Sequence, residues 1–163
     1  MKTKRVSLIC LLLVLMLPCC KEKETRKQII NYFNNDILRI SELEQVALKD
    51  YGAVTGENYT SDETLHKALT SKVIPTYSRF VTLLEEIHPP NEELRQLHYL
   101  YIQSARAYQT GFALLLSALE KRDPALTQAA NRYLAEGRKK GKEWRKGFLA
   151  LCKKHGVKLI FKK

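Results

Sequence analysis

The chain has 163 residues and a formal net charge of +11, because 28 lysines and arginines outnumber 17 aspartates and glutamates. Hydrophobic residues make up 45% of the chain, which excludes a disordered or low-complexity protein. The length is that of one domain, and it is sufficient to bury a single hydrophobic core.

The first residues have the pattern of a bacterial export signal. Lys2, Lys4 and Arg5 precede a run of 12 residues, 6–17, that is apolar except for Ser7. As a helix this run would span about 18 Å, whereas the hydrocarbon core of a bilayer is about 30 Å thick. The run therefore favours a cleaved signal over a permanent membrane-spanning helix.

The boundary after this run, Leu17-Pro18-Cys19-Cys20, resembles a bacterial lipobox. In that family a leucine lies three positions before a cysteine, the cysteine is diacylated on its sulfur, and the signal is cleaved just before it. The resemblance predicts that Cys20 is the lipidated residue, since Leu17 then takes the favoured position. Cys19 is the alternative, although Pro18 would then precede the cleavage site and resist cleavage.

The resemblance implies a signal peptide at residues 1–19, a lipidated N-terminus and linker at 20–23, and a helical domain at 24–163. A covalent N-terminal lipid is expected and no other cofactor. Two or more acyl chains would hold the mature protein on a membrane. The implied location is the extracytoplasmic side of a bacterial cell envelope. Lys21, where an aspartate could stand, favours the outer membrane if the host has one.

The basic charge is concentrated at the C-terminus. Loss of the signal would leave 25 basic and 17 acidic residues, a net charge of +8. Residues 138–163 contain eleven basic residues and one acid, Glu143, which gives +10. Nucleic acid is not expected as a partner, because an exported protein rarely meets it and no aromatic-rich binding motif is interleaved with the charge. Anionic lipid, an acidic envelope polymer or an acidic protein fits the charge, as does a solvated face that binds nothing.

Helical periodicity in four segments predicts an all-α fold. Apolar side chains recur at steps of three and four in residues 24–54, and this helix should end near 52–56. Thr60 and Glu63 resemble a capping box for a second helix, in which Pro75 should cause a kink or a break. The two predicted apolar stripes are Ile30, Phe33, Ile37, Ile40, Leu43, Ala47, Tyr51 and Val54, then Leu65, Leu69, Val73, Thr76, Phe80, Leu83 or Leu84, and Ile87.

Two prolines, Pro89 and Pro90, separate the second helix from a third that Asn91 can cap. Asp123 and Pro124 suit the N-cap and first position of a fourth helix, which should end near residues 155–156. Short connections and the lack of a strand pattern predict an antiparallel four-helix bundle with a short C-terminal tail. The predicted stripes are Leu94, Leu97, Tyr101, Ser104, Tyr108, Gly111, Leu115 and Ala118, then Leu126, Ala130, Tyr133, Gly137, Gly141, Trp144, Phe148 and Leu151.

Two glycines, Gly137 and Gly141, lie on the buried stripe of the fourth helix. Each costs about 1 kcal/mol relative to alanine in a helix interior. Close approach of a neighbouring helix, against the ring of Tyr101 or Tyr108, would explain them. The alternative is a ligand-sized gap between the helices, walled by tyrosines, which would suit a carrier of small ligands.

The sequence contains two Glu-x-x-His pairs, Glu63 with His66 and Glu85 with His88. Both pairs fall on the same predicted helix, about 33 Å apart, so they cannot share a metal pair as in di-iron carboxylate bundles. A weaker metal candidate joins His88 to His98 of the next helix. Both histidines lie beside core positions, which favours a structural role, and no metal site is expected.

No catalytic constellation is present in the sequence. A Gly-rich phosphate loop, a nucleophile elbow and a Ser-His-Asp order are all missing, so an enzyme is not expected. Cys152 stands before Lys153-Lys154-His155, but haem attachment needs a second cysteine. The preferred interpretation of Cys152 is a buried structural thiol.

The last residues, 157–163, alternate apolar and basic side chains. They would either cap the helices with Leu159 and Phe161 or lie on a membrane, where each lysine gains about 1 kcal/mol from anionic headgroups. The sequence as a whole predicts a membrane-anchored, non-enzymatic lipoprotein that binds an envelope partner, with small-ligand or metal carriage as the alternative. The lysines predicted to contact a membrane or an anionic partner are Lys153, Lys154, Lys158, Lys162 and Lys163.

Overall fold

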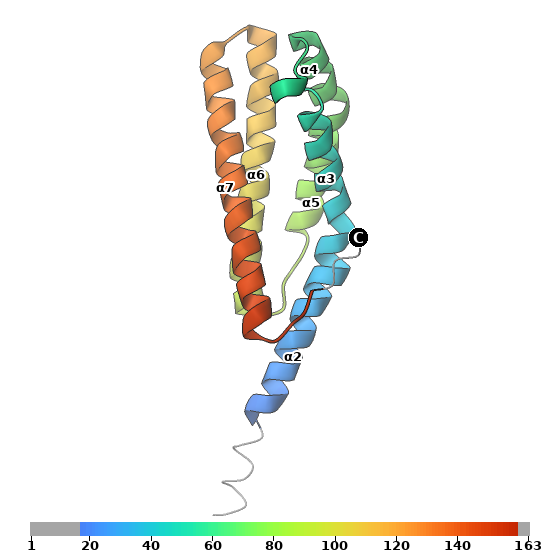
Figure 1. Cartoon of the computed structure of the whole chain (residues 1–163), viewed down its shortest axis with the longest axis vertical. Helices are drawn as coiled ribbons and strands as arrows, with labels where there is room; N and C mark the ends of the chain where they lie inside the picture. Colours follow the sequence, from blue (N-terminus) through green and yellow to red (C-terminus); the bar gives the residue numbers. More distant parts are fainter. Residues whose placement is uncertain (1–16, 160–163) are drawn as a thin grey trace, which may run out of the picture.

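A computed structural model describes residues 17–159, with side chains from residue 22 onward. Within that span all regular structure is helical and there is no strand, which confirms the predicted all-α class (Figure 1). The predicted signal peptide lies largely outside the described residues, and so do Phe161, Lys162 and Lys163. Cys19 and Cys20 fall within the first described helix, α2 (Leu17–Asn31).

The first helical rod consists of α2, the π-helical turn η1 (Tyr32–Ile37) and α3 (Leu38–Gly52). A π turn contains an extra residue, which explains the five-residue step between two buried side chains, Tyr32 and Ile37. The predicted stripe was wrong before this turn, because Ile30 is 39% exposed and Ile29 is fully buried. The predicted end of the helix, near Gly52, is confirmed.

A connection that contains the short 3-10 helix η2 (Gly56–Asn58) leads to α4 (Asp62–Ala68). The N-cap is Ser61, whose hydroxyl accepts a hydrogen bond from the Thr64 N–H at 3.2 Å. The capping box predicted at Thr60 was therefore wrong by one residue. An N-cap side chain bonds to the N–H of the second or third residue of its helix. Thr64 is the third residue of α4, and Ser61 is the residue directly before the helix.

The second rod stays helical through Pro75. The π-helical turn η3 (Leu69–Val73) links α4 to α5 (Ile74–Glu85) and widens the backbone just before the proline. Proline lacks an N–H and crowds the preceding turn, and the wider turn accommodates both defects without a break. The buried stripe then passes through Tyr77 and not through Thr76, contrary to the prediction. The other buried side chains of this rod include the predicted Leu65, Leu69, Val73, Phe80 and Leu84, together with Val81.

Local capping signals in the second half of the chain are confirmed. Asn91 accepts from the Leu94 N–H at 2.9 Å and begins α6 (Glu92–Lys121). Asp123 accepts from the Ala125 N–H at 2.8 Å and begins α7 (Pro124–Lys154).

The side chain of Tyr133 in α7 was wrongly predicted to be buried. It is 41% exposed, whereas the neighbouring Leu134 is buried against Gly111 of α6. Steps of three and four from Ala130 to Gly137 allow either residue on the stripe, so periodicity alone does not choose between them.

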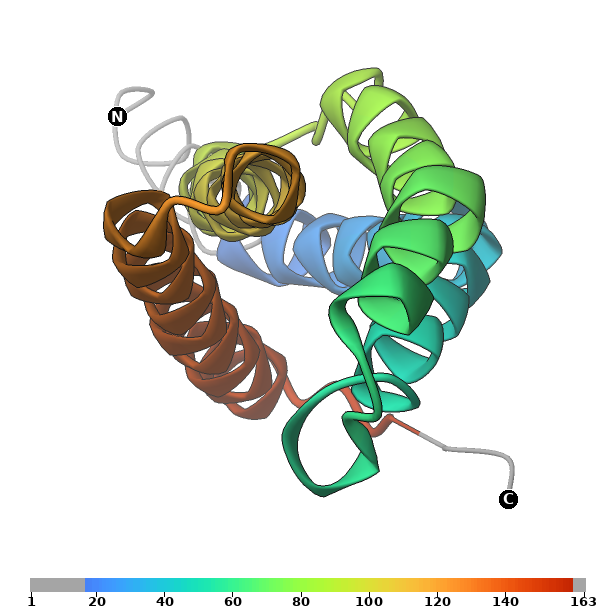
Figure 2. The ribbon, with the colours of Figure 1, turned by 90° about the horizontal axis from the view of Figure 1, so that it is seen from above.

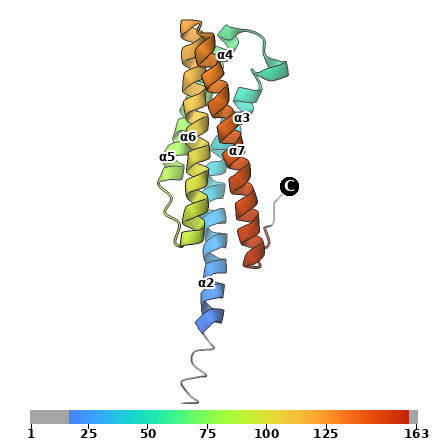
Figure 3. The same ribbon diagram turned by 90° about the vertical axis from the view of Figure 1, so that its left-hand side faces the viewer.

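The long helices α6 and α7 pack against each other, and α3 packs against α5 (Figures 1 and 3). In Figure 2, α6 and α7 lie on one side of the molecule, and α3 and α5 lie on the other. The core is rich in aromatic side chains, and the largest fully buried ones are Tyr32, Tyr77, Phe80 and Phe112. At one end of the molecule α2 projects beyond the other helices, while α4 lies at the opposite end (Figures 1 and 3).

Candidate functional site

Exposed cationic side chains cover one side of the middle of α7. At about 100° per residue, these positions fall within an arc of about 120° around the helix. Both acids of this helix, Glu136 and Glu143, lie outside the arc. We call this surface the α7 basic face, and it consists of Arg138, Lys139, Lys142, Arg145 and Lys146.

The charges of the α7 basic face are not neutralised by ion pairs within the described residues. By contrast, the neighbouring Lys140 bonds to the Gln103 side chain at 2.9 Å and lies 3.8 Å from Glu136. Like charges four positions apart, such as Arg138 with Lys142, destabilise a helix by about 0.2–0.5 kcal/mol per pair. The sequence therefore keeps a charge pattern that is unfavourable for the isolated helix.

The C-terminal end of α7 lies at the same end of the molecule as α2 (Figures 1 and 3). The Arg26 guanidinium of α2 donates to the His155 carbonyl at 3.0 Å, which joins the two segments. After Gly156 the chain turns back, and the N–H of the buried Val157 bonds to the Cys152 carbonyl at 2.8 Å.

Two of the predicted contact lysines, Lys153 and Lys158, are exposed at this end, and we call them the basal lysines. A third, Lys154, forms an ion pair with Glu93 at the start of α6. Hydrogen bonds from Lys154 and His155 hold the pKa of the Glu93 carboxyl below its usual range. Lys154 therefore connects α7 to α6 and is only partly available to a partner.

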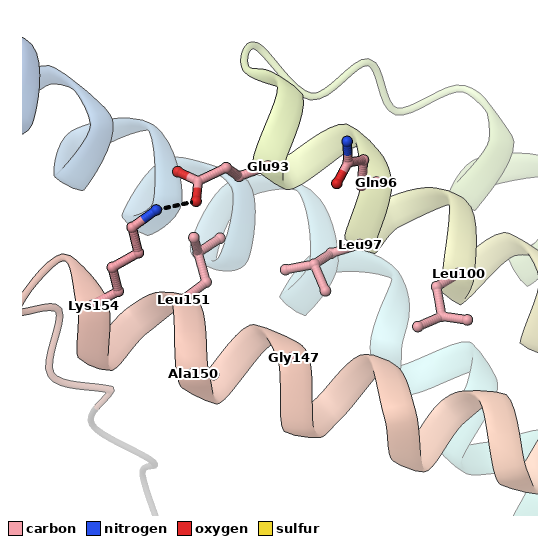
Figure 4. A pocket seen from close by; sticks show the side chains of 8 residues that line it. All are labelled: Glu93, Gln96, Leu97, Leu100, Gly147, Ala150, Leu151 and Lys154. Atoms are coloured by element: carbon pink, nitrogen blue, oxygen red, sulfur yellow. Dashed lines mark hydrogen bonds and ion pairs between the residues drawn. The ribbon is translucent and has the colours of Figure 1, made fainter.

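An open groove of about 460 Å³ lies between α6 and α7 (Figure 4). Its floor is apolar, and the ion pair between Glu93 and Lys154 closes one end. Gly147 lies along the groove, and a Cβ there would approach Leu97 Cδ2 to 2.5 Å. The lining residues are Glu93, Gln96, Leu97, Leu100, Gly147, Ala150, Leu151 and Lys154.

A partly buried cluster of one carboxylate and two aromatic side chains joins α3, α6 and α7. The Tyr101 hydroxyl donates to the Glu44 carboxylate at 2.6 Å, and the Tyr101 ring stacks on Trp144 with centroids 4.1 Å apart. Burial raises the pKa of Glu44, while the Tyr101 hydrogen bond and the charge of Arg145 oppose the shift. The sequence analysis missed Glu44, although it lies four residues after Ile40 and three before Ala47, both of which are buried.

One polar atom near this cluster, the Tyr77 hydroxyl, is inaccessible to solvent and has no hydrogen-bond partner within the described residues. The buried Trp144 indole nitrogen makes no well-aligned hydrogen bond, but it lies near the Tyr32 hydroxyl, where it opposes the rise that burial gives to the pKa of Tyr32. Burial raises the pKa of Tyr77, and the charge of Glu44 adds to the shift. Buried polar atoms are normally paired with protein or water, so the Tyr77 hydroxyl is an exception that a water or another small polar molecule would satisfy.

The metal candidate His98 is a buried core residue. Its Nδ1 lies 3.0 Å from the Tyr32 hydroxyl and its Nε2 lies 3.0 Å from the Leu84 carbonyl. Burial lowers the pKa of His98, which favours the neutral ring. His88 is exposed and pairs with the Glu86 carbonyl. No cluster of three or more potential metal ligands occurs in residues 17–159.

The glycines of α7 lie where α6 approaches closely. A Cβ on Gly137 would lie 2.6 Å from Tyr108 Cδ2, and one on Gly141 would lie 3.1 Å from the Ser104 hydroxyl. The close approach predicted at Gly137, with Tyr108 as one of two partners, is confirmed. The space beside Gly137 is filled by that ring, which argues against the ligand-sized gap considered as the alternative.

Cys152 was predicted to be a buried structural thiol, and it is 3% exposed. Burial raises the pKa of its thiol, so the reactive thiolate is disfavoured.

The chain matches no known family model, and neither curated proteins nor solved structures include a similar one. The helices of the described segment include none that is long and apolar enough to cross a membrane.

Proposed function

We propose that the protein is a non-enzymatic binding protein of a bacterial cell envelope, held on the membrane by acyl chains on Cys20. The proposal rests on the lipobox-like boundary at residues 17–20. It is supported by the arrangement of the helices, since the start of α2, which contains Cys20, and the C-terminal end of α7, beside the basal lysines, lie at the same end of the molecule (Figure 1). In this arrangement the basal lysines face the lipid headgroups.

The distance from the anchor to the basal lysines is short. Cys20 precedes Arg26 by six residues, which is about 9 Å along α2. Arg26 is hydrogen-bonded to His155, so the end of α7 lies about this distance from the anchor along the helix. Electrostatic attraction is screened over about 8 Å at physiological ionic strength. The basal lysines are therefore near enough to a membrane surface for anionic headgroups to attract them.

This electrostatic contact supplements the acyl chains. Each lysine near an anionic surface contributes about 1 kcal/mol, so the basal lysines together add about 2 kcal/mol. One acyl chain gives only marginal membrane binding, and a second signal makes it stable. Lys162 and Lys163, outside the described residues, would add to the same effect if they lie at this end.

We also infer that the helical rods form an antiparallel four-helix bundle. Residues 53–61 join α3 to α4, 86–91 join α5 to α6, and 122–123 join α6 to α7. Helices joined by such short connections pack as antiparallel neighbours. The packing of α3 on α5, of α5 on α6 and of α6 on α7 fits this order. In such a bundle α7 packs on α6 with one side, and its other side, which includes the α7 basic face, is exposed to solvent.

The test of the anchor compares two neighbouring cysteines. Full-length protein is expressed in a bacterium fed a clickable palmitate analogue, as wild type, as Cys20→Ser and as the matched control Cys19→Ser. We expect label on the wild type and on Cys19→Ser, and none on Cys20→Ser. Label lost only from Cys19→Ser would move the anchor to Cys19. Absence of label from all three proteins would refute the proposal.

A second candidate function is carriage of a small polar ligand in the envelope. The observation that favours it is the buried, unpartnered Tyr77 hydroxyl, which lies near enough to the Glu44 carboxylate to feel its charge. A metal would be less suitable at His98, since both of its ring nitrogens already have partners. Native mass spectrometry and elemental analysis of the purified protein test this candidate. A ligand or metal at one equivalent would favour it over a pure interaction module.

A further inference from the structure

We propose that the α7 basic face binds a linear polyanion above the membrane. The membrane part of this inference rests on the proposed function, because the lipid on Cys20 sets the height of the face. The binding chemistry rests on the charges of the face alone.

The α7 basic face is too far from the anchor to contact the membrane when the molecule stands on its basal end. Lys146 lies nine residues before His155, and Arg138 lies seventeen before it, which places them about 14 Å and 26 Å along α7. The segment from Cys20 to Arg26 adds about 9 Å, so the face lies about 23–35 Å above the headgroups. This is several times the screening length of about 8 Å. Anionic lipid headgroups can therefore attract the basal lysines, but they are too far away to bind the α7 basic face.

The composition of the α7 basic face favours a charged polymer over a folded protein. Stable protein interfaces have an apolar or aromatic centre with the charges at its rim. Here the arc contains five exposed cations, and beside them a single exposed large apolar side chain, Leu149. A surface of this kind recognises its partner through charge and contributes little apolar burial.

The spacing of the cations suits an extended chain of anions. Arg138, Lys142 and Lys146 recur every four residues, so neighbouring side chains are about 6 Å apart along one side of the helix. Arg145 lies at the edge of the face that is nearer to Glu44. Its positive charge favours the ionised form of the Glu44 carboxyl. The arginines add forked donors, which match phosphate or carboxylate oxygens in pairs. A polymer that carries one anion per repeat can meet successive cations along α7.

The test uses full-length protein isolated from cells and kept in micelles of a neutral detergent. The probe is fluorescently labelled inorganic polyphosphate, and its binding is followed by fluorescence anisotropy at several salt concentrations. The face variant combines Arg138→Gln, Lys142→Gln and Lys146→Gln. The matched control combines Arg39→Gln, Lys67→Gln and Lys72→Gln, which removes the same charge from exposed positions on the first and second rods. Circular dichroism verifies that both variants remain helical.

We expect the face variant to bind polyphosphate about tenfold or more weakly than the wild type, and the control to stay within about twofold. Removal of three contacts should also reduce the slope of log K against log salt by about 2. An equal loss in both variants, or a wild type that binds neither polyphosphate nor polygalacturonate, would overturn the proposal. A parallel titration with polygalacturonate distinguishes a phosphate polymer from a carboxylate polymer, and tight, face-dependent binding of either one supports the proposal.

Anionic vesicles provide the test of the competing partner. If the face variant loses more affinity for vesicles of phosphatidylglycerol than for polyphosphate, the α7 basic face lies on the membrane and the proposal is overturned. Failure of lipidation is a separate result. Unlabelled Cys20 together with face-dependent polyphosphate binding would refute the membrane anchor and its height argument, while leaving the polyanion site of α7 in place.

Discussion

Substitution of Gly137 by alanine tests the close approach of α7 to the Tyr108 ring of α6. A Cβ at this position would lie 2.6 Å from Tyr108 Cδ2 and 3.0 Å from two further atoms of that ring. Alanine gains about 1 kcal/mol over glycine from helix propensity. Overpacking costs about 1–3 kcal/mol, and the contact is with a flat ring that moves only as a whole. We expect Gly137→Ala to lower the free energy of unfolding by about 1 kcal/mol.

Gly147→Ala is the matched control in the same helix. Its Cβ would approach Leu97 Cδ2 to 2.5 Å, but the next nearest atom, Leu97 Cγ, is 3.9 Å away. The Leu97 side chain faces the open groove between α6 and α7, so it can rotate away (Figure 4). The propensity gain should then survive, and this variant should be about 0.5–1 kcal/mol more stable than the wild type.

Urea unfolding followed by circular dichroism measures both variants on the segment from residue 22 to 163. A double-mutant cycle with Tyr108→Ala isolates the contact, because the cost of Gly137→Ala should largely disappear when the ring is absent. The reasoning fails if Gly137→Ala is as stable as Gly147→Ala. It also fails if the cost persists in the Tyr108→Ala background.

Three further predictions concern the buried polar groups and the basal lysines. Because burial raises the pKa of Glu44, the folded chain holds that proton more tightly than the unfolded chain. Its contribution to the free energy of unfolding therefore decreases as pH rises from 4.5 through the raised value. Glu44→Gln should remove this slope in urea titrations at several pH values, and an unchanged slope would assign it to other groups. Tyr32→Phe leaves His98 Nδ1 without its partner and should cost about 1–3 kcal/mol in the same assay; an unchanged midpoint would mean that the bond contributes nothing. The segment 22–163 should bind phosphatidylglycerol vesicles less tightly at high salt, and Lys153→Gln with Lys158→Gln should weaken that binding about tenfold or more, from about 1 kcal/mol per lysine. Equal binding to neutral vesicles would contradict this interpretation.

Local chemistry made much of this fold predictable. Asn91 and Asp123 cap helices through side-chain oxygens that reach N–H groups two or three residues away, so the signal is contained in a few neighbouring positions. The unbroken stepping of α6 is another local signal. It follows from a regular α-helix that packs along one side.

A π turn explains the wrong register in the first rod. η1 inserts an additional residue, so the stripe before it passes through Ile29 and not Ile30. After η3 only Thr76 was wrong, because Tyr77 is buried in its place while the predicted Phe80 and Leu84 are buried. Periodicity assumes a constant 3.6 residues per turn, and it cannot place an interruption of that period. Pro75 predicted a kink or a break in the helix, but it did not predict that a π-helical turn would keep the second rod helical.

The buried polar contacts depend on tertiary structure and could not be predicted from the sequence. Tyr32 and His98 are 66 positions apart, and Glu44 and Tyr101 are 57 apart. Only the packing of α6 against the first rod brings each pair together. The charge of the α7 basic face, by contrast, was evident in the sequence, and the structure adds its separation from the basal lysines.

Mass spectrometry of the N-terminal peptide tests the membrane anchor most directly. The protein is isolated from separated membrane and cytosolic fractions, and its N-terminal fragment is analysed after proteolysis. We predict a membrane-bound chain that begins at Cys20 and carries the added mass of at least two acyl chains. A chain recovered from the cytosol with Met1 still present and both Cys19 and Cys20 unmodified would contradict the proposed function.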